Sequence, residues 1–403
     1  MIKIPTLALC VICAICVPAL AQQKPPVAQY WMSVETAAGM SMPGMGGMAG
    51  MMSGMMGGQQ QSGRRIGLQL GSQRAADAPN AAHDIPAAMN MGPSLPLLTP
   101  HATAASASPE RAEREPPEAM ERPKGRMLLY WGCGEATRSG QPVVMDFSRM
   151  AQGQMPPGWV SRRMATGSPP SGRTVGHWPN QQDSKAVPDS ASLIGEHTVR
   201  GNYTPDMRFS LAQGQDFMER VELSATASGA GGAVVRWNTP ATATGYFATV
   251  FGGDGNDSIF WSSSEVQEFG LQQDWLPPGE VARLIREKVV LSPQTSECTV
   301  PAAVVKQAGT PLLSFIAYGP EANFGFPPRP QDPQWYVKVR FKSTASTLLG
   351  DAGAGRGRAQ RAQPARAPTV PAPAGDTTAQ PAPPATPDPL KDGLNILRGI
   401  FGR

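Results

Sequence analysis

Charged and aromatic residues are scarce in this 403-residue sequence: 16% are Asp, Glu, Lys or Arg and 6% are aromatic, against 44 glycines and 42 prolines. A chain of this composition cannot bury a core along its whole length. Its net charge of +4 is small and dispersed, which argues against a nucleic-acid partner. We therefore expect folded regions interrupted by long disordered segments.

Sequence motifs of common enzymes are also missing. The chain has no G-x-S-x-G, H-E-x-x-H, phosphate-loop or dinucleotide-binding pattern. The histidines have no partner at catalytic spacing; they are His83, His101, His177 and His197. A hydrolase assembled from distant residues, such as His197 with Asp206 and a serine, stays an alternative. The sequence favours a protein that is not an enzyme.

The first residues are typical of a cleaved export signal. Lys3 precedes an apolar run, Ile4 to Leu20, which ends in the small-x-small sequence Ala19-Leu20-Ala21. No small residue precedes the cysteines of this run directly, so a lipid anchor is not indicated. We expect cleavage after Ala21 and a periplasmic or secreted protein.

Outside that signal the sequence has only two cysteines, Cys133 and Cys298. In an oxidising compartment such a pair favours one disulfide. Two buried free thiols are the alternative. The pair is too small for a structural zinc site, which takes four ligands.

The most regular stretch is Val234 to Ser264, VVRWNTPATATGYFATVFGGDGNDSIFWSSS. β-branched and aromatic residues alternate in it with a period of two, as on a half-buried strand. Trp237 ends one run, Pro240 lies in the turn, and Gly245-Tyr246 opens the next. This pattern resembles strands B and C of fibronectin type III and other immunoglobulin-like domains. The resemblance implies that Trp237 and Tyr246 are core residues of a sandwich.

Two hairpins and one helix are expected elsewhere. Val27–Glu35 and Arg65–Leu70 predict strands around a Gly/Met-rich loop, and Met127–Cys133 pairs with Pro142–Phe147. Further strands are predicted at Val304-Val305, Leu312–Tyr318 and Trp335–Phe341. Apolar residues spaced as on one helix face follow Pro278; they are Val281, Leu284, Ile285 and Val289. The fold class predicted is mainly β: antiparallel immunoglobulin-like sandwiches with one short helix, plus extensive disordered segments.

Composition divides the chain into six regions. They are a signal peptide (1–21), an extended region with the Met/Gly-rich loop (22–125), a hairpin with a turn-rich excursion (126–193), the main β domain (194–345), a disordered Pro/Ala-rich linker (346–389) and an amphipathic helix (390–403). The apolar face of this helix contains Leu394, Leu397 and Phe401. The helix could dock on its own core, in a partner's groove or on a membrane surface. The long linker favours a target outside the domain.

The Met-rich run offers a candidate metal site. Its methionines are spaced so that several sulfurs can wrap one ion: Met45, Met48, Met51, Met52, Met55 and Met56. Thioether sulfur favours Cu(I). An unstructured loop that binds no metal is the alternative, because the run contains neither His nor Cys.

Two weaker candidates lie elsewhere. Asp254 and Asp257, in GGDGNDSIF, fit one glycine-rich calcium repeat, but a single repeat cannot supply a full ligand set, so a hairpin turn is favoured. Trp159 and Trp178 could stack on a sugar or peptide, or pin a loop to the core.

The sequence therefore predicts an exported, non-enzymatic binding or assembly protein of the cell envelope. Its partner would be an envelope protein or the membrane surface, reached through the C-terminal helix. A periplasmic copper protein is the first alternative and a hydrolase the second. No small-molecule ligand can be named from sequence.

Overall fold

The computed structural model describes residues 25–39, 62–99, 125–150, 152–160, 167, 169–253, 257–268, 275–309, 311–327 and 333–349. Strands account for 46% and helices for 9% of it. The mainly β class expected from the sequence is therefore confirmed.

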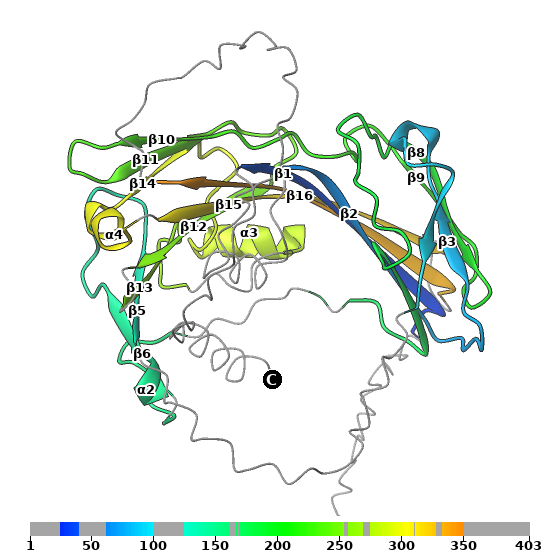
Figure 1. Cartoon of the computed structure of the whole chain (residues 1–403), viewed down its shortest axis with the longest axis horizontal. Helices are drawn as coiled ribbons and strands as arrows, with labels where there is room; N and C mark the ends of the chain where they lie inside the picture. Colours follow the sequence, from blue (N-terminus) through cyan, green and yellow to red (C-terminus); the bar gives the residue numbers. More distant parts are fainter. Residues whose placement is uncertain are drawn as a thin grey trace, which may run out of the picture.

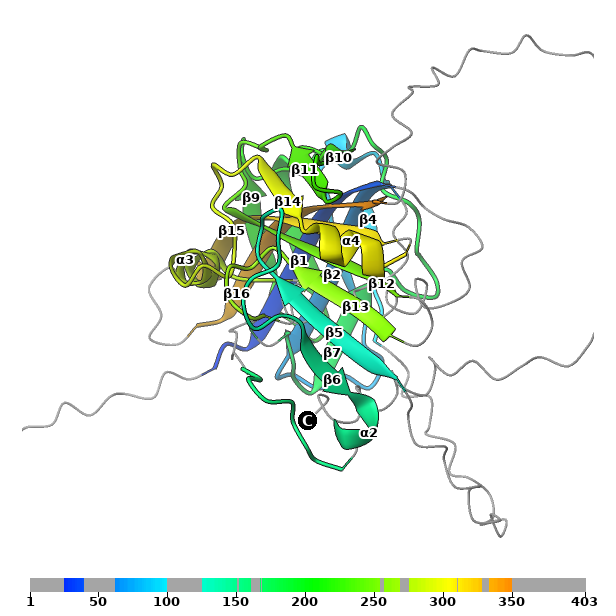
Figure 2. The same cartoon turned by 90° about the vertical axis from the view of Figure 1, so that its left-hand side faces the viewer.

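Nine strands form one sheet in the order β6-β5-β13-β12-β15-β16-β1-β2-β7. The bounds are β1 Ala28–Gly39, β2 Gly63–Ser72, β5 Arg126–Trp131, β6 Val143–Asp146, β7 Thr174–Trp178, β12 Gly245–Gly253, β13 Asp257–Ser262, β15 Leu312–Phe326 and β16 Trp335–Leu348. Figure 1 shows the sheet bent into an arch, and Figure 2 shows its β6 end facing the viewer. The pairs β1 with β16 and β13 with β5 are parallel, so the sheet is mixed rather than purely antiparallel.

Two smaller sheets cover the outer side of the arch (Figure 1). One has the order β10-β11-β14 and the other β4-β3-β8-β9. Their bounds are β3 Ala81–Asp84, β4 Ser94–Leu97, β8 Gly195–Gly201, β9 Met207–Leu211, β10 Leu223–Ala227, β11 Ala233–Trp237 and β14 Glu297–Val300. The main hydrophobic core lies between these sheets and the large one.

The period-two pattern of β1 decides which residues enter this core. Tyr30, Met32 and Val34 are fully buried against the outer layer. Ser33 and Glu35 alternate with them and lie on the inner face of the arch. The same alternation holds in β2 and β16.

The expected hairpins form. β1 pairs with β2, β5 with β6, and β12 with β13, all antiparallel. The nine-stranded sheet takes strands from the predicted regions 22–125, 126–193 and 194–345. These three stretches of sequence therefore share one sheet.

The described helices are short: α2 Phe147–Met150, α3 Pro278–Arg286, α4 Ala302–Gln307 and a 3-10 turn, Ala87–Met89. The predicted helix is α3, whose Val281 and Leu284 are buried against β12 and β15 on the inner face. The strand predicted at Val304-Val305 is wrong, because these residues lie in α4. Pro301 precedes the first turn of α4, and Val304 faces the core.

Trp237 and Tyr246 are core residues, as the resemblance implied. Trp237 lies on the three-stranded sheet and Tyr246 on the nine-stranded sheet, with ring centroids 5.7 Å apart. Phe315 of β15 completes the cluster, 4.7 Å from Trp237.

Cys133 and Cys298 form the expected disulfide, with the sulfurs 2.09 Å apart. Cys133 follows β5 of the large sheet, and Cys298 lies in β14 of the three-stranded sheet. The bridge therefore joins two layers of the fold.

Candidate functional site

The inner face of the arch over β16, β1, β2 and β7 carries rows of polar side chains. Strand register places the members of each row side by side. The rows are Lys338 with Trp31, Gln69 and His177; Arg340 with Ser33 and Gly67; and Lys342 with Glu35 and Arg65. α3 covers the neighbouring part of this face, over β12 and β15, and within the rows Trp31 and Lys342 are buried, at 9% and 5% exposed.

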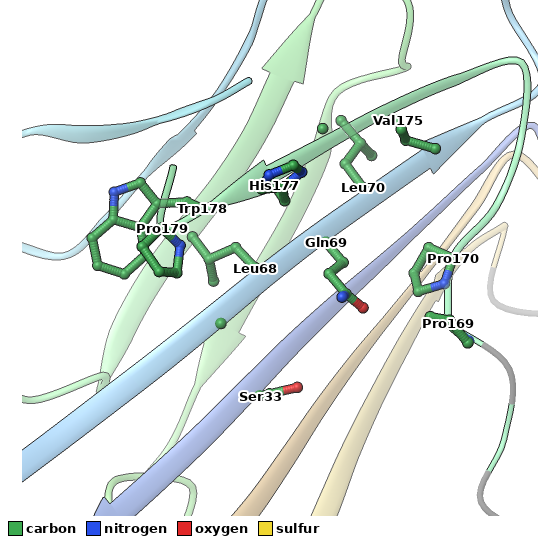
Figure 3. Close-up of a pocket in the computed structure, with 12 residues that line it drawn as sticks. Ser33, Leu68, Gln69, Leu70, Pro169, Pro170, Val175, His177, Trp178 and Pro179 are labelled. Carbon is green, nitrogen blue, oxygen red and sulfur yellow. The ribbon is translucent and has the colours of Figure 1, made fainter. Parts of the chain in front are cut away.

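A groove of about 510 Å³ opens at Gly67, in the row that also contains Arg340 and Ser33. An added Cβ at Gly67 would meet only Ser33, at 3.9 Å, so the missing side chain leaves a depression. The lining comprises Ser33, Gly67, Leu68, Gln69, Leu70, Pro169, Pro170, Val175, Gly176, His177, Trp178 and Pro179. Figure 3 shows Gln69 and Ser33 on neighbouring strands, with Pro169 and Pro170 at one side.

Three polar side chains enter the groove, each from a different strand. Ser33 accepts a hydrogen bond from Nε of Arg340, at 2.8 Å. The amide of Gln69 and the ring of His177 make no hydrogen bond in the part of the chain that the structure describes. Both groups are therefore available to a ligand.

Cations and indoles interleave beside the groove. Arg340 packs over Trp31 at 4.6 Å and over Trp275 at 4.4 Å, and Lys342 lies 4.4 Å from the Trp275 ring. Such cation–π contacts fix a long side chain at a modest energetic gain. They hold Arg340 in the position from which it reaches Ser33.

The Pro169-Pro170 wall of the groove is held by close backbone contact with the end of β2. An added Cβ at Gly71 would lie 2.7 Å from backbone atoms of Ser171, and one at Gly172 would collide with the carbonyl of Ser72. Only glycine lets the two backbones approach so closely.

A second polar cluster lies deep in the core. The Tyr30 hydroxyl is 2.8 Å from Nδ1 of His83, and Nε2 of His83 is 3.0 Å from Nδ1 of His197. Nε2 of His197 is 2.7 Å from the carbonyl of Leu193. This carbonyl can only accept, which fixes every proton: His197 donates to Leu193, His83 to His197, and Tyr30 to His83.

Burial keeps both rings of this cluster neutral. It lowers the pKa of His83 well below the ordinary 6.5, and repulsion from His197 lowers it further. Burial likewise lowers the pKa of His197, against a raising contribution from its bond to Leu193. A second proton has no place in the chain, because each ring nitrogen already has a partner.

Several predicted sites fall outside the described residues. They are the Met-rich run with Met45, Met48, Met51, Met52 and Met55, and the helix face with Leu394, Leu397 and Phe401. His101 and Asp254 also fall outside. Among the residues described, no three His, Cys, Asp or Glu side chains are grouped to hold a metal ion.

Asp257 is the first residue of β13, which pairs antiparallel with β12. Its two carboxylate oxygens accept from Arg126, at 2.9 and 2.6 Å. The antiparallel pairing of β12 with β13 confirms the hairpin, whose residues 254–256 lie outside the described structure, and Asp257 is engaged in an ion pair with Arg126.

The proposed pairing of His197 with Asp206 does not form. Asp206 is exposed, whereas His197 is 1% exposed and both its nitrogens are bonded elsewhere. Trp178 is 3% exposed and offers no face for stacking. Trp159 is half-buried and packs against Met127 and its neighbours. Trp178 is thus a core residue at the end of β7, and Trp159 packs its loop against the Met127 cluster.

Sequence reasoning missed the groove. Ser33 and Gln69 lie on strands that the sequence predicts, but the alternation points to their apolar neighbours as the core and gives their own positions no role. The signal was the polar complement of each alternation, at positions 31, 33 and 35, at 65, 67 and 69, and at 338, 340 and 342. The register that joins these sets spans about 300 residues and could not be read locally.

None of the described helices is long and apolar enough to cross a membrane. Comparisons with protein-family models, curated proteins and solved structures found no match. The function is therefore argued from the site.

Proposed function

We propose that this chain is a non-enzymatic binding protein that takes a small polar ligand in the inner-face groove. The observation that carries the proposal is the convergence of Ser33, Gln69 and His177 on one opening of about 510 Å³. This is a suitable size for a small ligand, and a few polar groups among apolar walls are typical of such sites.

Binding is favoured over catalysis by the lining itself. Ser33 and His177 belong to different rows and are separated by β2, so His177 does not face the hydroxyl as a general base. No carboxylate belongs to the lining. A serine hydrolase needs a serine, a histidine and a carboxylate that are hydrogen-bonded to one another in that order.

The wider role follows from the sequence. The signal-like residues 1–21 support export, and an envelope location suits a β scaffold with the tethered helix that the sequence predicts at 390–403. Trp237 and Tyr246, which face each other across two sheets, support an immunoglobulin-like origin for that part of the scaffold.

A fragment screen followed by NMR tests the binding site. We expect small polar fragments to shift the side-chain amide signal of Gln69 and the ring signals of His177. Gln69→Ala should lose these hits, and Gln154→Ala, at an exposed glutamine outside the groove, should keep them. Hits that cluster elsewhere, or that survive Gln69→Ala unchanged, would refute the assignment.

The attachment role has its own test. Full-length protein and a form ending at Pro389 are compared for co-sedimentation with envelope membranes. The proposal expects the truncated form to become soluble while its groove still binds fragments. Equal partitioning of the two forms would remove the helix from the account.

A further inference from the structure

The groove offers its ligand both hydrogen-bond donors and acceptors. The side-chain amide of Gln69 donates two hydrogens and accepts through its oxygen, and a neutral His177 ring donates from one nitrogen and accepts at the other. The Ser33 oxygen accepts from Arg340, and its own hydroxyl hydrogen can be donated. A ligand that contacts these groups must therefore donate as well as accept.

The groove itself has no fixed charge. None of the described residues that line it is Asp, Glu, Lys or Arg. On the face beside it, Lys338 lies 3.3 Å from the carboxylate of Glu321, and Lys342 lies 3.8 Å from that of Glu35. Because each lysine has a counter-charge of its own, the site suits an uncharged ligand better than an ionised one.

The polar side chains of the groove are spread along it rather than gathered at one point. Gln69 and His177 are directly opposite each other on β2 and β7. Ser33, on β1, is opposite Gly67, two residues away from Gln69 along β2. Neighbouring strands lie about 4.8 Å apart and two residues of a strand span about 6.8 Å, so the backbones of Ser33 and His177 are about 12 Å apart. A ligand that reaches all three groups must be elongated, on the scale of two linked rings.

Proline rings bound the groove at both ends. Figure 3 shows Gln69 between Pro179 on one side and Pro169 with Pro170 on the other. Pro169 and Pro179 are exposed, and a proline side chain presents only C–H groups. These rings offer an apolar surface to the ligand while the polar side chains bind its edge.

We propose, on the basis of the binding function inferred above, that the groove binds an uncharged oligosaccharide of at least two sugar rings. A sugar hydroxyl both donates and accepts, so neighbouring hydroxyls match the amide of Gln69 and the ring of His177. The C–H faces of the sugar rings pack against Pro169 and Pro179. A carboxylate only accepts and an ammonium only donates, so either would leave polar groups of the groove unpaired, at a cost in affinity.

An extended peptide is the other elongated ligand that both donates and accepts. Its N–H and C=O groups repeat along the backbone and are normally matched by the edge of a sheet. The groove instead lies on the face of the sheet, over β2, which pairs with β1 on one side and β7 on the other. Side chains rather than strand backbone therefore meet the ligand, which favours the oligosaccharide.

NMR titration of the full-length protein at pH 7.5 tests the ligand class. The neutral probes are maltose, cellobiose, lactose and N,N′-diacetylchitobiose, each beside its own monosaccharides. The competing probes are digalacturonic acid and tetra-alanine blocked at both ends. The proposal predicts that at least one neutral disaccharide shifts the Gln69 amide and His177 ring signals and binds at least tenfold more tightly than its monosaccharides.

Two results would overturn the proposal. One is that no neutral disaccharide binds. The other is that the blocked peptide or digalacturonic acid binds at least tenfold more tightly than every neutral disaccharide, which would assign the groove to a peptide or to an acidic ligand.

Three variants test whether the disaccharide binds in the groove. Gln69→Met keeps the length of the side chain and removes its donors and acceptor, so it should weaken disaccharide binding at least tenfold. Ser33→Ala removes the hydroxyl and should weaken it at least threefold. Gln154→Ala, at an exposed glutamine outside the groove, should match the wild type. Disaccharide binding that Gln69→Met leaves unchanged would refute the proposed contact.

Failure of the oligosaccharide is distinguishable from failure of the binding function. If polar fragments still shift Gln69 and His177 while no neutral disaccharide binds, the oligosaccharide is wrong and the binding groove stands. If the fragment screen also finds no binding at the groove, both proposals are wrong. Thermal unfolding of each variant, within about 2 °C of the wild type, shows that the fold is intact.

Discussion

Individual residues on the two faces of β1 have opposite roles. Tyr30 faces outward into the core and ends a buried hydrogen-bond chain, whereas Ser33 faces inward and meets Arg340. A strand can serve two sites because its side chains alternate between faces. The buried chain bears on stability, and the inner face on the proposed binding.

The buried histidines predict a pH-dependent stability. Both have a pKa below the ordinary 6.5 in the folded state, so below about pH 6.5 the unfolded chain binds protons that the folded chain does not. The free energy of unfolding is therefore greatest above that pH and falls on acidification, by up to about 1.4 kcal/mol per pH unit for each histidine. Urea unfolding between pH 7.5 and 5 measures the slope.

Two variants assign this slope to the cluster. The triple change Tyr30→Phe, His83→Leu and His197→Leu removes the titrating groups and should flatten the dependence, whereas His177→Ala should not. A slope that persists in the triple variant would mean that other groups cause it.

At the scale of elements, the segment before β7 shapes one wall of the groove. Gly172→Ala introduces a Cβ that collides with the Ser72 carbonyl, so residues 169–172 must shift. We expect a loss of about 1–3 kcal/mol in stability and weaker ligand binding. Gly229→Ala is the control, because an added Cβ there meets nothing within 4 Å. Calorimetry measures ligand affinity and urea unfolding measures stability in both variants. Equal affinity and equal stability in the two variants would contradict this role of the segment.

The disulfide links elements that lie far apart in the sequence. It closes a loop across 165 positions, for which the chain-entropy account gives about 5 kcal/mol of stabilisation. The double variant Cys133→Ala and Cys298→Ala should unfold at a lower urea concentration than the oxidised protein and match the reduced protein. If reduction leaves the unfolding midpoint unchanged, the bridge contributes little.

Local patterns predicted the strands and α3, because period-two and helical spacing are properties of short windows. Local patterns did not predict features that depend on residues far apart in the sequence. The parallel pairing of β1 with β16 joins Ser33 to Arg340 across 307 positions, and no local signal announces it. Val304 has high β propensity, yet Pro301 and core contacts place it in a helix.

At the scale of the whole molecule, we expect the groove to bind its ligand without the Met-rich run, which lies outside the described structure. β1 ends at Gly39 and β2 begins at Gly63, so removing Met40–Met56 leaves enough chain to close the hairpin. We expect the deletion to leave ligand binding and unfolding unchanged. Copper(I) content, measured on the same samples, distinguishes the alternative: bound copper that vanishes with the deletion would support a metal role for the run.

The whole arch bends around its inner face, and the central claim is that this face binds a ligand through the depression at Gly67. The most direct test is to fill it. The Cβ of Gly67→Leu would meet only Ser33 within 4 Å, so we expect the fold to persist.

The measurement is calorimetric titration of wild-type and Gly67→Leu protein with the strongest hit from the fragment screen. The account predicts that the filled groove loses at least tenfold in affinity while thermal unfolding stays unchanged. Equal affinity in the two proteins would contradict the account and place the binding site elsewhere.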